Sequence, residues 1–422
     1  MFIGYVYKLI KILYFTDNHM RLYNMDRTLS WVFRGDMKIV AVEPIFVDRY
    51  LFVRIKTDNG LTGVGEAGTW GFLEAAAGAV EVCREYLLGS DPLRIEYHGQ
   101  YLYKSSHFRG AAIMGALSAV DIALWDIAGQ YYDVPVYRLL GGGDRCRDKL
   151  RTYVHVKSPS IDEHLRLILK AKEEGYTAVG HLNPFLDVSR DEIWKTVPFA
   201  KKIQTAVENV ARFRESAGDD MDLCLELHRR LDFPEAVALA KGIERYYPMF
   251  YEDPIRPENL DLMGDLAKAI SLPIAGGERY VNLEEFAMLL SRGAVRYARI
   301  SVCAIGGLTV ARKIASMAEG FGVKVVPHNP ANLSPLSTAA CVQLSAAISN
   351  FSILEIPRDE FSSRKRNIIK SSITIEEGYI PVPERPGIGA ALSDDVIGNP
   401  DFSHAVRGAK AVVMDDGSCA TR

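Results

Sequence analysis

Three glutamates recur at equal intervals in the second half of the chain, each after a short apolar run. Glu226 ends the run DLCLE, Glu252 lies in MFYEDP and Glu278 in LPIAGGER, and both intervals are 26 residues (252 − 226 = 26, 278 − 252 = 26). A strand, a helix and their loops take roughly this length in a parallel α/β repeat, so the three acids would meet at one rim. Clustered carboxylates repel one another unless a cation lies between them, and oxygen ligands suit a hard divalent ion. The spacing therefore predicts one Mg²⁺ per subunit.

Further polar side chains follow other strand-like runs and would reach the same rim. Histidine titrates near neutral pH and is the commonest general acid or base, although a lone histidine at a strand end is more often merely solvated. His228 is the exception, because it lies two residues after Glu226 and so shares its face of the strand. The candidates at the remaining strand ends are His181, Asn183, His328 and Glu355.

Composition narrows the class of protein. The chain has 422 residues, 48% of them hydrophobic, and a formal net charge of −3. This length suits a barrel of about 250 residues with a second domain. A chain with no basic excess has no surface for a polyanion, so we expect no nucleic-acid partner. The six cysteines form no CxxC pair, which favours reduced thiols and a cytoplasmic protein.

The pattern along the chain predicts four segments. Residues 1–36 are interpreted as a leader outside the fold, because clear periodicity begins only with the alternating run at Met37. Their one apolar stretch is too short to span a bilayer, and we expect no membrane partner. Residues 37–147 open with two strands joined at an Asp-Asn-Gly turn and continue with helices near 73–88 and 112–131, which predicts an α+β capping domain. Residues 148–356 alternate strands and helices, and residues 357–422 would return to the capping domain.

The alternating segment predicts a closed barrel and not an open sheet. It contains eight apolar strand-like runs, and no Gly-rich phosphate loop follows the first of them. The fold class is thus α/β, a barrel of the TIM type with an α+β cap. The runs lie near residues 151–156, 178–183, 222–228, 249–254, 272–277, 297–302, 324–329 and 351–356.

The chain resembles the enolase superfamily, specifically its mandelate racemase subgroup, and within that the sugar-acid dehydratases of the galactonate dehydratase type. The resemblance extends from about Met37 to about Ile397, and its motifs occur in the family's order. They are TDNGLTGVGEA, FRGAAIMGALSAVDIALWDIAGQ, LELHRR, FYEDP, AGGER, AIGGLTVARKIASMAE, VVPHNP and ERPGIG.

The resemblance implies a fold and a chemistry. The fold would be a modified (β/α)₇β barrel closed by the α+β cap, with Mg²⁺ held by the three glutamates. His328 would remove the proton next to the carboxylate of a small acid-sugar substrate. His228 would assist departure of the β-hydroxyl, and Glu355 would hydrogen bond the substrate carboxylate. Cap loops, with Trp70 and Arg109, would select the substrate, and we expect a homo-oligomer.

Three positions depart from the family pattern. Glu226 stands where relatives usually have Asp, and Ser301 stands where they have an Asp that pairs with the seventh-strand histidine. His181 occupies the place of a lysine base. Because serine cannot stabilise an imidazolium as a carboxylate does, the base stays open between His328 and His181.

Two alternatives to dehydration remain. A racemase or epimerase would reprotonate the same intermediate on its opposite face, using His181 and His328 as opposed bases. A catalytically weak barrel kept for binding would explain Ser301. His228 favours dehydration over racemisation or epimerisation, because elimination requires an acid beside the departing hydroxyl. The presence of all three glutamates and all three histidines argues against the weak barrel.

Overall fold

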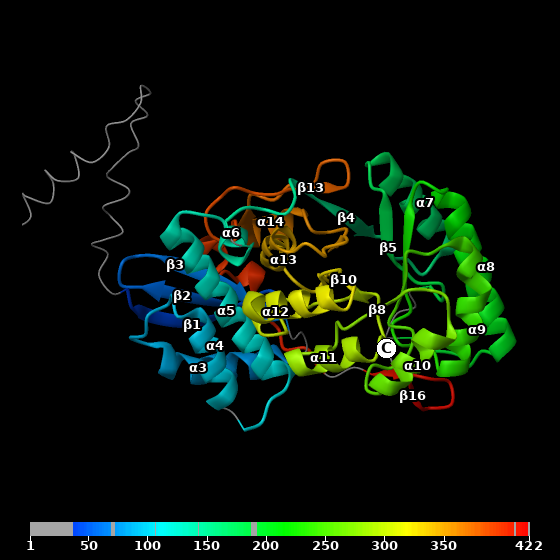
Figure 1. Ribbon diagram of the computed structural model, residues 1–422, viewed down its shortest axis with the longest axis horizontal. Coiled ribbons are helices and arrows are strands. Elements are labelled where there is room, and N and C mark those ends of the chain that lie inside the picture. The colour runs from blue at the N-terminus through cyan, green and yellow to red at the C-terminus, as the bar shows by residue number, and fades with distance from the viewer. Residues whose placement is uncertain are drawn as a thin grey trace, which may run out of the picture. The chain divides into compact units, whose positions relative to one another are not determined.

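The computed structural model describes residues 37–420 except 69–71, 106, 142, 187–191 and 409–410 (Figure 1). The chain divides into two units, Met1–Met37 and Lys38–Arg422, and every element named below belongs to the second. The predicted leader and Trp70 lie outside the described residues.

The first part of this unit is a three-stranded antiparallel sheet in the order β1-β2-β3, packed against helix α5. Gly63 and Gly65 on β3 allow the helix backbone to approach, because a Cβ at either position would lie within 2.0 Å of a carbonyl oxygen of α5. The elements are β1 (Ile39–Val47), β2 (Tyr50–Thr57), β3 (Thr62–Glu66), α3 (Leu73–Leu87), α4 (Ile95–Ser105), α5 (Ala111–Tyr132) and α6 (Val136–Gly141).

Helix α5 is the apolar centre of this part of the chain. Among the described residues it is the one helix long and apolar enough to cross a membrane, but 78% of its most apolar window is buried inside the protein. Its burial on nearly all sides explains its continuous apolar sequence.

Eight parallel strands follow and form a barrel, as predicted. Their order is β10-β9-β8-β7-β6-β5-β4-β11, and a parallel bridge between Val325 and Phe351 joins the two ends. The bridge carries two backbone hydrogen bonds, Val325 N to Asn350 O and Ser352 N to Val325 O, both 2.9 Å. The strands are β4 (Lys149–His155), β5 (Ala178–Leu182), β6 (Asp222–Glu226), β7 (Phe250–Glu252), β8 (Ile274–Gly276), β9 (Tyr297–Ala298), β10 (Lys324–Val325) and β11 (Leu354–Ile356).

One long helix follows each of the first seven barrel strands, which confirms the predicted (β/α)₇β arrangement. Capping boxes begin two of these helices, at Asp232 and Asn282. The helices are α7 (Ile161–Glu173), α8 (Phe199–Ala217), α9 (Phe233–Ile243) with the short η1 (Glu244–Tyr246), α10 (Leu260–Ala269), α11 (Leu283–Ser291), α12 (Gly307–Gly320) and α13 (Pro335–Ala347).

The segment after β11 contacts both earlier parts. Strand β13 pairs with β4 of the barrel, whereas the backbone N–H of Ile388 donates to Asp126 of α5 at 3.0 Å. A further bridge joins Trp194 to Met414. The elements are α14 (Ser363–Ile368), β12 (Ile369–Ser371), β13 (Tyr379–Pro381), β14 (Ala390–Leu392), η2 (Asp394–Val396), η3 (Pro400–Phe402), β15 (Val412–Val413) and β16 (Cys419–Ala420).

Buried polar contacts attach α5 to α12 of the barrel. Asp121 accepts from the backbone N–H of Thr309 at 3.0 Å and also from its hydroxyl, and Trp125 Nε1 donates to that hydroxyl at 2.9 Å. Gly307 fits beneath Asp121, since a Cβ there would lie 2.2 Å from Oδ2. The contact therefore depends on a glycine at position 307.

We expect Gly307→Ala to destabilise the protein more than Gly322→Ala. Both glycines have positive φ, 78° and 67°, so each alanine carries a backbone cost of about 1–2 kcal/mol. Only position 307 adds a clash, because nothing lies within 4 Å of a Cβ at 322. Overpacking should add about 1–3 kcal/mol at position 307. Urea unfolding measures the free energy of unfolding of both variants. Equal losses would show that the α5–α12 contact adjusts to the added methyl group without cost.

Asp121 also makes stability depend on pH. Burial raises the pKa of Asp121 from 3.8 to about 7. The unfolded chain releases this proton at lower pH, so the stability from the protonated group is complete below about pH 4 and is lost as pH rises through 7. Between pH 5 and pH 8 wild-type protein should lose more unfolding free energy than Asp121→Asn, in which this group cannot titrate. Parallel slopes in urea unfolding would contradict the assignment.

Candidate active site at the barrel mouth

Each of the eight barrel strands places one ionisable side chain at or just beyond its carboxyl end. Equivalent ends of parallel strands meet at one rim of a barrel, which is where enzymes of this architecture collect their reactive groups. In order from β4 to β11 the residues are His155, His181, Glu226, Glu252, Glu278, Arg299, His328 and Glu355.

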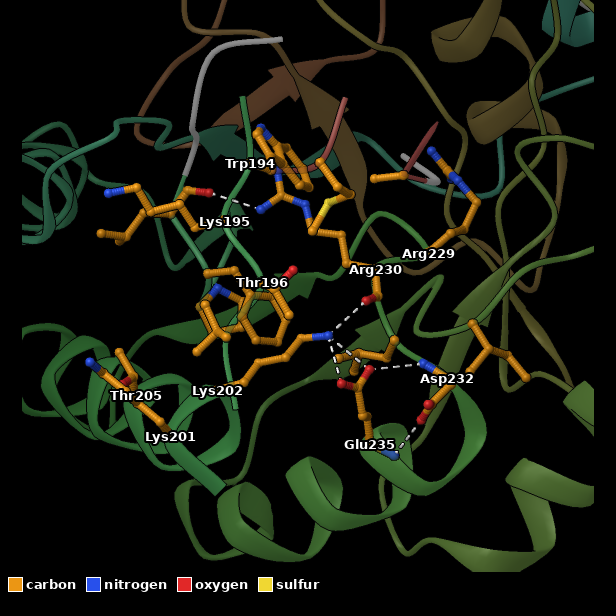
Figure 2. A pocket seen from close by; sticks show the side chains of 18 of the residues that line it. Trp194, Lys195, Thr196, Lys201, Lys202, Thr205, Arg229, Arg230, Asp232 and Glu235 are labelled. Atoms are coloured by element: carbon orange, nitrogen blue, oxygen red, sulfur yellow. Dashed lines mark hydrogen bonds and ion pairs between the residues drawn. The ribbon is translucent and has the colours of Figure 1, made fainter. Parts of the chain in front are cut away.

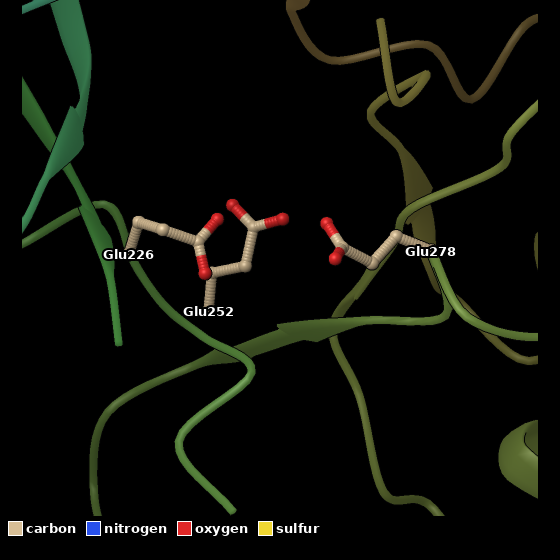
Figure 3. Close-up of side chains that lie close together, drawn as sticks. All are labelled: Glu226, Glu252 and Glu278. Atoms are coloured by element: carbon tan, nitrogen blue, oxygen red, sulfur yellow. The ribbon is translucent and has the colours of Figure 1, made fainter. Parts of the chain in front are cut away.

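The three predicted acids come together. Glu226, Glu252 and Glu278 each offer a carboxylate oxygen, and these oxygens all lie within 4.8 Å of one another (Figure 3). Burial and repulsion by the other two acids raise the pKa of Glu226 well above its usual range. Burial likewise raises the pKa of Glu252 to about 8, although Arg299 opposes it. An oxygen-only cluster under this electrostatic strain fits a divalent cation.

A buried arginine pairs with the third acid. Arg229 directly follows His228, and its Nη1 lies 2.7 Å from Glu278 and also contacts Asp253. Burial opposes ionisation of Glu278, but His328 and Arg229 together hold the pKa of Glu278 below its ordinary value. Glu278 is thus an acid of the triad whose negative charge is compensated by protein side chains.

His328 lies between Ser301 and Glu278. The Ser301 hydroxyl oxygen is 2.6 Å from Nδ1 of His328, and Nε2 is 3.2 Å from Glu278 Oε2. The same hydroxyl donates to the carbonyl of Glu278 at 3.2 Å. Burial lowers the pKa of His328 more than Glu278 raises it. Ser301 therefore contacts the His328 ring where the family pattern has an aspartate, but its hydroxyl carries no charge.

His181 is presented by a β-bulge. From Val179 to Leu182, strand β5 advances three residues while β6 advances two, and His181 has a φ of 56°, which is unusual for a residue other than glycine. Its Nδ1 is buried, with no hydrogen-bond partner among the described residues. Burial, reinforced by His155, holds the pKa of His181 well below its ordinary value.

Three imidazole rings form a row across β4, β5 and β6. The ring centroids of His155 and His181 are 4.9 Å apart, and those of His181 and His228 are 4.7 Å apart. At the far end of the row, His228 Nε2 is 4.0 Å from Glu226 Oε1. The row thus ends beside the acid triad.

The remaining predicted residues are placed differently. Glu355 accepts from Nε2 of His155 at 2.7 Å, and Asn183 turns its amide onto its own loop, where its oxygen accepts from Phe185 N at 2.9 Å. Arg109 lies on the exposed segment before α5, with its guanidinium 4.1 Å from the ring centre of Tyr103. The contacts of Arg109 and Asn183 are local, so their substrate roles stay predictions.

Sequence reasoning missed three residues of this site. His155 stands at the end of the first barrel strand, so the same strand-end argument applies to it. Arg229 and Arg299 gave no signal, because an arginine near a strand end usually faces solvent. Only the measured burial, 6% and 1% exposure, shows that both side chains point inward.

A cavity of about 970 Å³ is lined by residues that include Arg229, the partner of Glu278 (Figure 2). Its walls come from the loops after β5 and β6, from α8 and from the segment around Met414. Arg230 lies 4.4 Å from the ring centre of Trp194, and Lys202 pairs with Glu235 at 2.8 Å. Arg229 lines this cavity and also pairs with Glu278, so it connects the cavity with the acid triad.

Comparison with known families agrees with this geometry. The family description for an enolase C-terminal domain-like region matches residues 168–396, and the mandelate racemase / muconate lactonizing enzyme N-terminal domain matches residues 33–141. The chain belongs to the enolase superfamily. Within it, the chain joins the mandelate racemase and muconate lactonizing enzyme group, which confirms the resemblance found in the sequence.

Two curated relatives have the same named activity. D-galactonate dehydratase of Pectobacterium atrosepticum is 32% identical over 355 residues, which cover 83% of this chain and 90% of the relative. D-galactonate dehydratase of Ralstonia pickettii is 33% identical over 357 residues, with the same coverage.

Solved structures of the superfamily have the same fold. An enolase from Agrobacterium radiobacter, bound to Na and L-malate, has a TM-score of 0.81 at 30% identity and covers 91% of this chain and all of its own. An enolase superfamily member from Salmonella Typhimurium has a TM-score of 0.80 at 28% identity, with coverage of 85% and 97%.

We expect Mg²⁺ to raise the melting temperature of the wild-type protein, because an ion at 100 times its dissociation constant stabilises the folded state by about 2.7 kcal/mol. Glu226→Gln should abolish this rise and yet melt at a higher temperature than metal-free wild type, because a neutral amide removes the cost of burying or protonating this acid beside two others.

The matched control is Glu360→Gln, a buried glutamate paired with Lys365. This variant should keep the full response to Mg²⁺. If millimolar Mg²⁺ left the melting temperature of the wild-type protein unchanged, the assignment of a metal to this site would be wrong.

Proposed function

We propose that this enzyme is a Mg²⁺-dependent dehydratase of a sugar acid, with galactonate as the first aldonate to test. Two findings support the proposal: the galactonate dehydratases that match most of the chain, and the acid triad with His228 beside it. The observation that most directly supports dehydration is the distance of 4.0 Å between His228 Nε2 and Glu226 Oε1.

The chemistry begins at the carbon next to the carboxylate. Removing its proton leaves an enediolate with two negative charges, which Mg²⁺ on the three glutamates would stabilise more than it stabilises the substrate. The base keeps that proton, the bond from the β-carbon to its hydroxyl breaks, and the hydroxyl leaves as water with a proton from the acid. The resulting enol becomes a 2-keto-3-deoxy acid.

We assign the base to His328 and the acid to His228. His328 has its Nδ1 fixed by Ser301 and its Nε2 directed at the acid triad, so one ring nitrogen is held and the other faces the reacting centre. His228 lies at the opposite end of the triad, beside Glu226. A base and an acid on separate sides of the metal ligands suit an elimination.

Epimerisation is the second candidate, and the bulge at His181 is the observation that favours it. His181 has a buried Nδ1 without a hydrogen-bond partner among the described residues, which could take a proton, and His181 and His328 stand on different strands. The weak binding barrel stays an alternative, because Ser301 contacts His328 without supplying a negative charge. The homo-oligomer stays a prediction.

A library of acid sugars tests the function directly. Each acid is incubated with enzyme and Mg²⁺, and 2-keto acids are detected by semicarbazide absorbance. We expect a keto acid from an aldonate and none after chelation. Inversion at the α-carbon with no loss of water would favour the epimerase, and inertness toward every acid sugar would overturn both activities.

Deuterium exchange separates the roles of the histidines. His228→Asn should lose dehydration by about 10²-fold or more, yet retain exchange of the substrate α-proton with solvent, since proton removal precedes hydroxyl loss. His328→Asn should lose both. If His328→Asn kept near-normal exchange and His181→Asn lost it, the base would be His181, in the bulge of β5, and not His328.

A further inference from the structure

Arg299 is a fully buried cation between two acids of the rim. Its guanidinium is 1% exposed, its Nε contacts Oε1 of Glu252, and its Nη2 lies 2.6 Å from Oε2 of Glu355. The third nitrogen, Nη1, faces the backbone carbonyls of Val326 and Pro327 at 3.4 and 3.3 Å. Every nitrogen of the fork thus has a defined acceptor, which fixes the plane of the group.

Glu355 is held from three directions. Besides Arg299, its Oε1 accepts from Nε2 of His155 at 2.7 Å and its Oε2 accepts from the backbone N–H of Asn329 at 2.7 Å. The contacts to Arg299 and to Asn329 require an acceptor and so keep the carboxyl ionised, which makes Nε2 of His155 the donor in the third contact. Although burial opposes ionisation, Arg299 and His155 hold the pKa of Glu355 well below its ordinary value.

These contacts do not suit the substrate role that the family resemblance implies for Glu355. A group that hydrogen bonds a substrate carboxylate must donate a proton, whereas an ionised glutamate only accepts and would repel the substrate. Its acceptor positions are, moreover, occupied by donors of the protein itself.

We propose that Glu355, His155 and Arg299 form a clamp that positions Glu252 for metal binding. Arg299 engages one oxygen of Glu252 and so sets the direction of its carboxylate, while Glu355 shares the positive charge of the guanidinium and prevents Glu252 from being neutralised by it. Glu355 and His155 are therefore positioning residues and do not contact the substrate. The inference rests on the metal site of the proposed function.

The clamp differs in its effects from a simple buried ion pair. A pair that served only stability would lower the melting temperature and leave metal affinity unchanged. A counter-ion without a positioning role would repel Mg²⁺, so that removing Arg299 would tighten binding. A clamp weakens binding when either member is removed, by about 10–100-fold, as for other groups that orient metal ligands.

The test is a double-mutant cycle on Mg²⁺ affinity without substrate. Calorimetric titration measures the dissociation constant of wild type, Arg299→Met, Glu355→Gln and the double variant. We expect each single variant to bind about 10–100-fold more weakly and the double variant to bind no more weakly than Arg299→Met, since both changes break one unit. Arg299→Lys, which keeps the charge but cannot bridge two acids, replaces the Met variant if that chain fails to fold.

A second buried ion pair supplies the matched control. Lys365 lies on α14, is 3% exposed and pairs with Glu360 at 3.4 Å and with Asp359 at 3.1 Å, two residues that precede the helix. Lys365→Met should lower the melting temperature and leave the Mg²⁺ dissociation constant at its wild-type value, which confirms that loss of a buried cation alone does not weaken the metal site.

Three results would overturn the clamp: wild-type affinity in both single variants, tighter binding in Arg299→Met, or additive losses in the double variant. If Glu355→Gln raised KM and left the Mg²⁺ affinity unchanged, the result would support a direct contact between Glu355 and the substrate. Failure of wild-type protein to bind Mg²⁺ at all is a different outcome, which would remove the metal from the proposed function and the clamp with it.

Discussion

Mutual repulsion of buried carboxylates is the constraint around which the barrel mouth is built. Glu226, Glu252 and Glu278 lie within a few ångströms of one another in a part of the protein with little access to water. Such an arrangement destabilises the fold unless positive charge is supplied or protons are taken up. The chain supplies part of it through Arg229 and Arg299, and leaves the remainder to a cation.

The distribution of this compensation is uneven. Arg229 contacts Glu278 directly and Arg299 contacts Glu252, whereas among the described residues no arginine or lysine forms an ion pair with Glu226, whose Oε1 accepts the backbone N–H of His228 at 3.0 Å. The part of the triad with least protein compensation therefore lies beside His228 and the row of imidazole rings. This asymmetry places the strongest attraction for a cation next to the group that we assign as the acid.

The strands and the triad could be predicted from the sequence because both follow from periodicity. A repeat of 26 residues fixes which side chains meet at a rim, whatever the details of the loops. Helices α4 and α6 escaped prediction, since α6 has only six residues and α4 has little net hydrophobic character. The inward direction of Arg299 and the bulge at His181 are results of tertiary packing. A bulge adds one residue without changing the apolar pattern, so no period in the sequence records it.

The final strand completes the barrel and the site in one step. Asn329 donates through its backbone to the carboxylate of Glu355 and through Nδ2 to its carbonyl oxygen at 3.2 Å, so a side chain extends the short pairing at the β10–β11 closure. All three acids precede β11 in the chain, and without β11 Arg299 would lack its contact with Glu355. The wall that holds the three acids would then be open between β10 and β4. We therefore expect activity only from chains that extend through β11, because the site is a property of the completed ring.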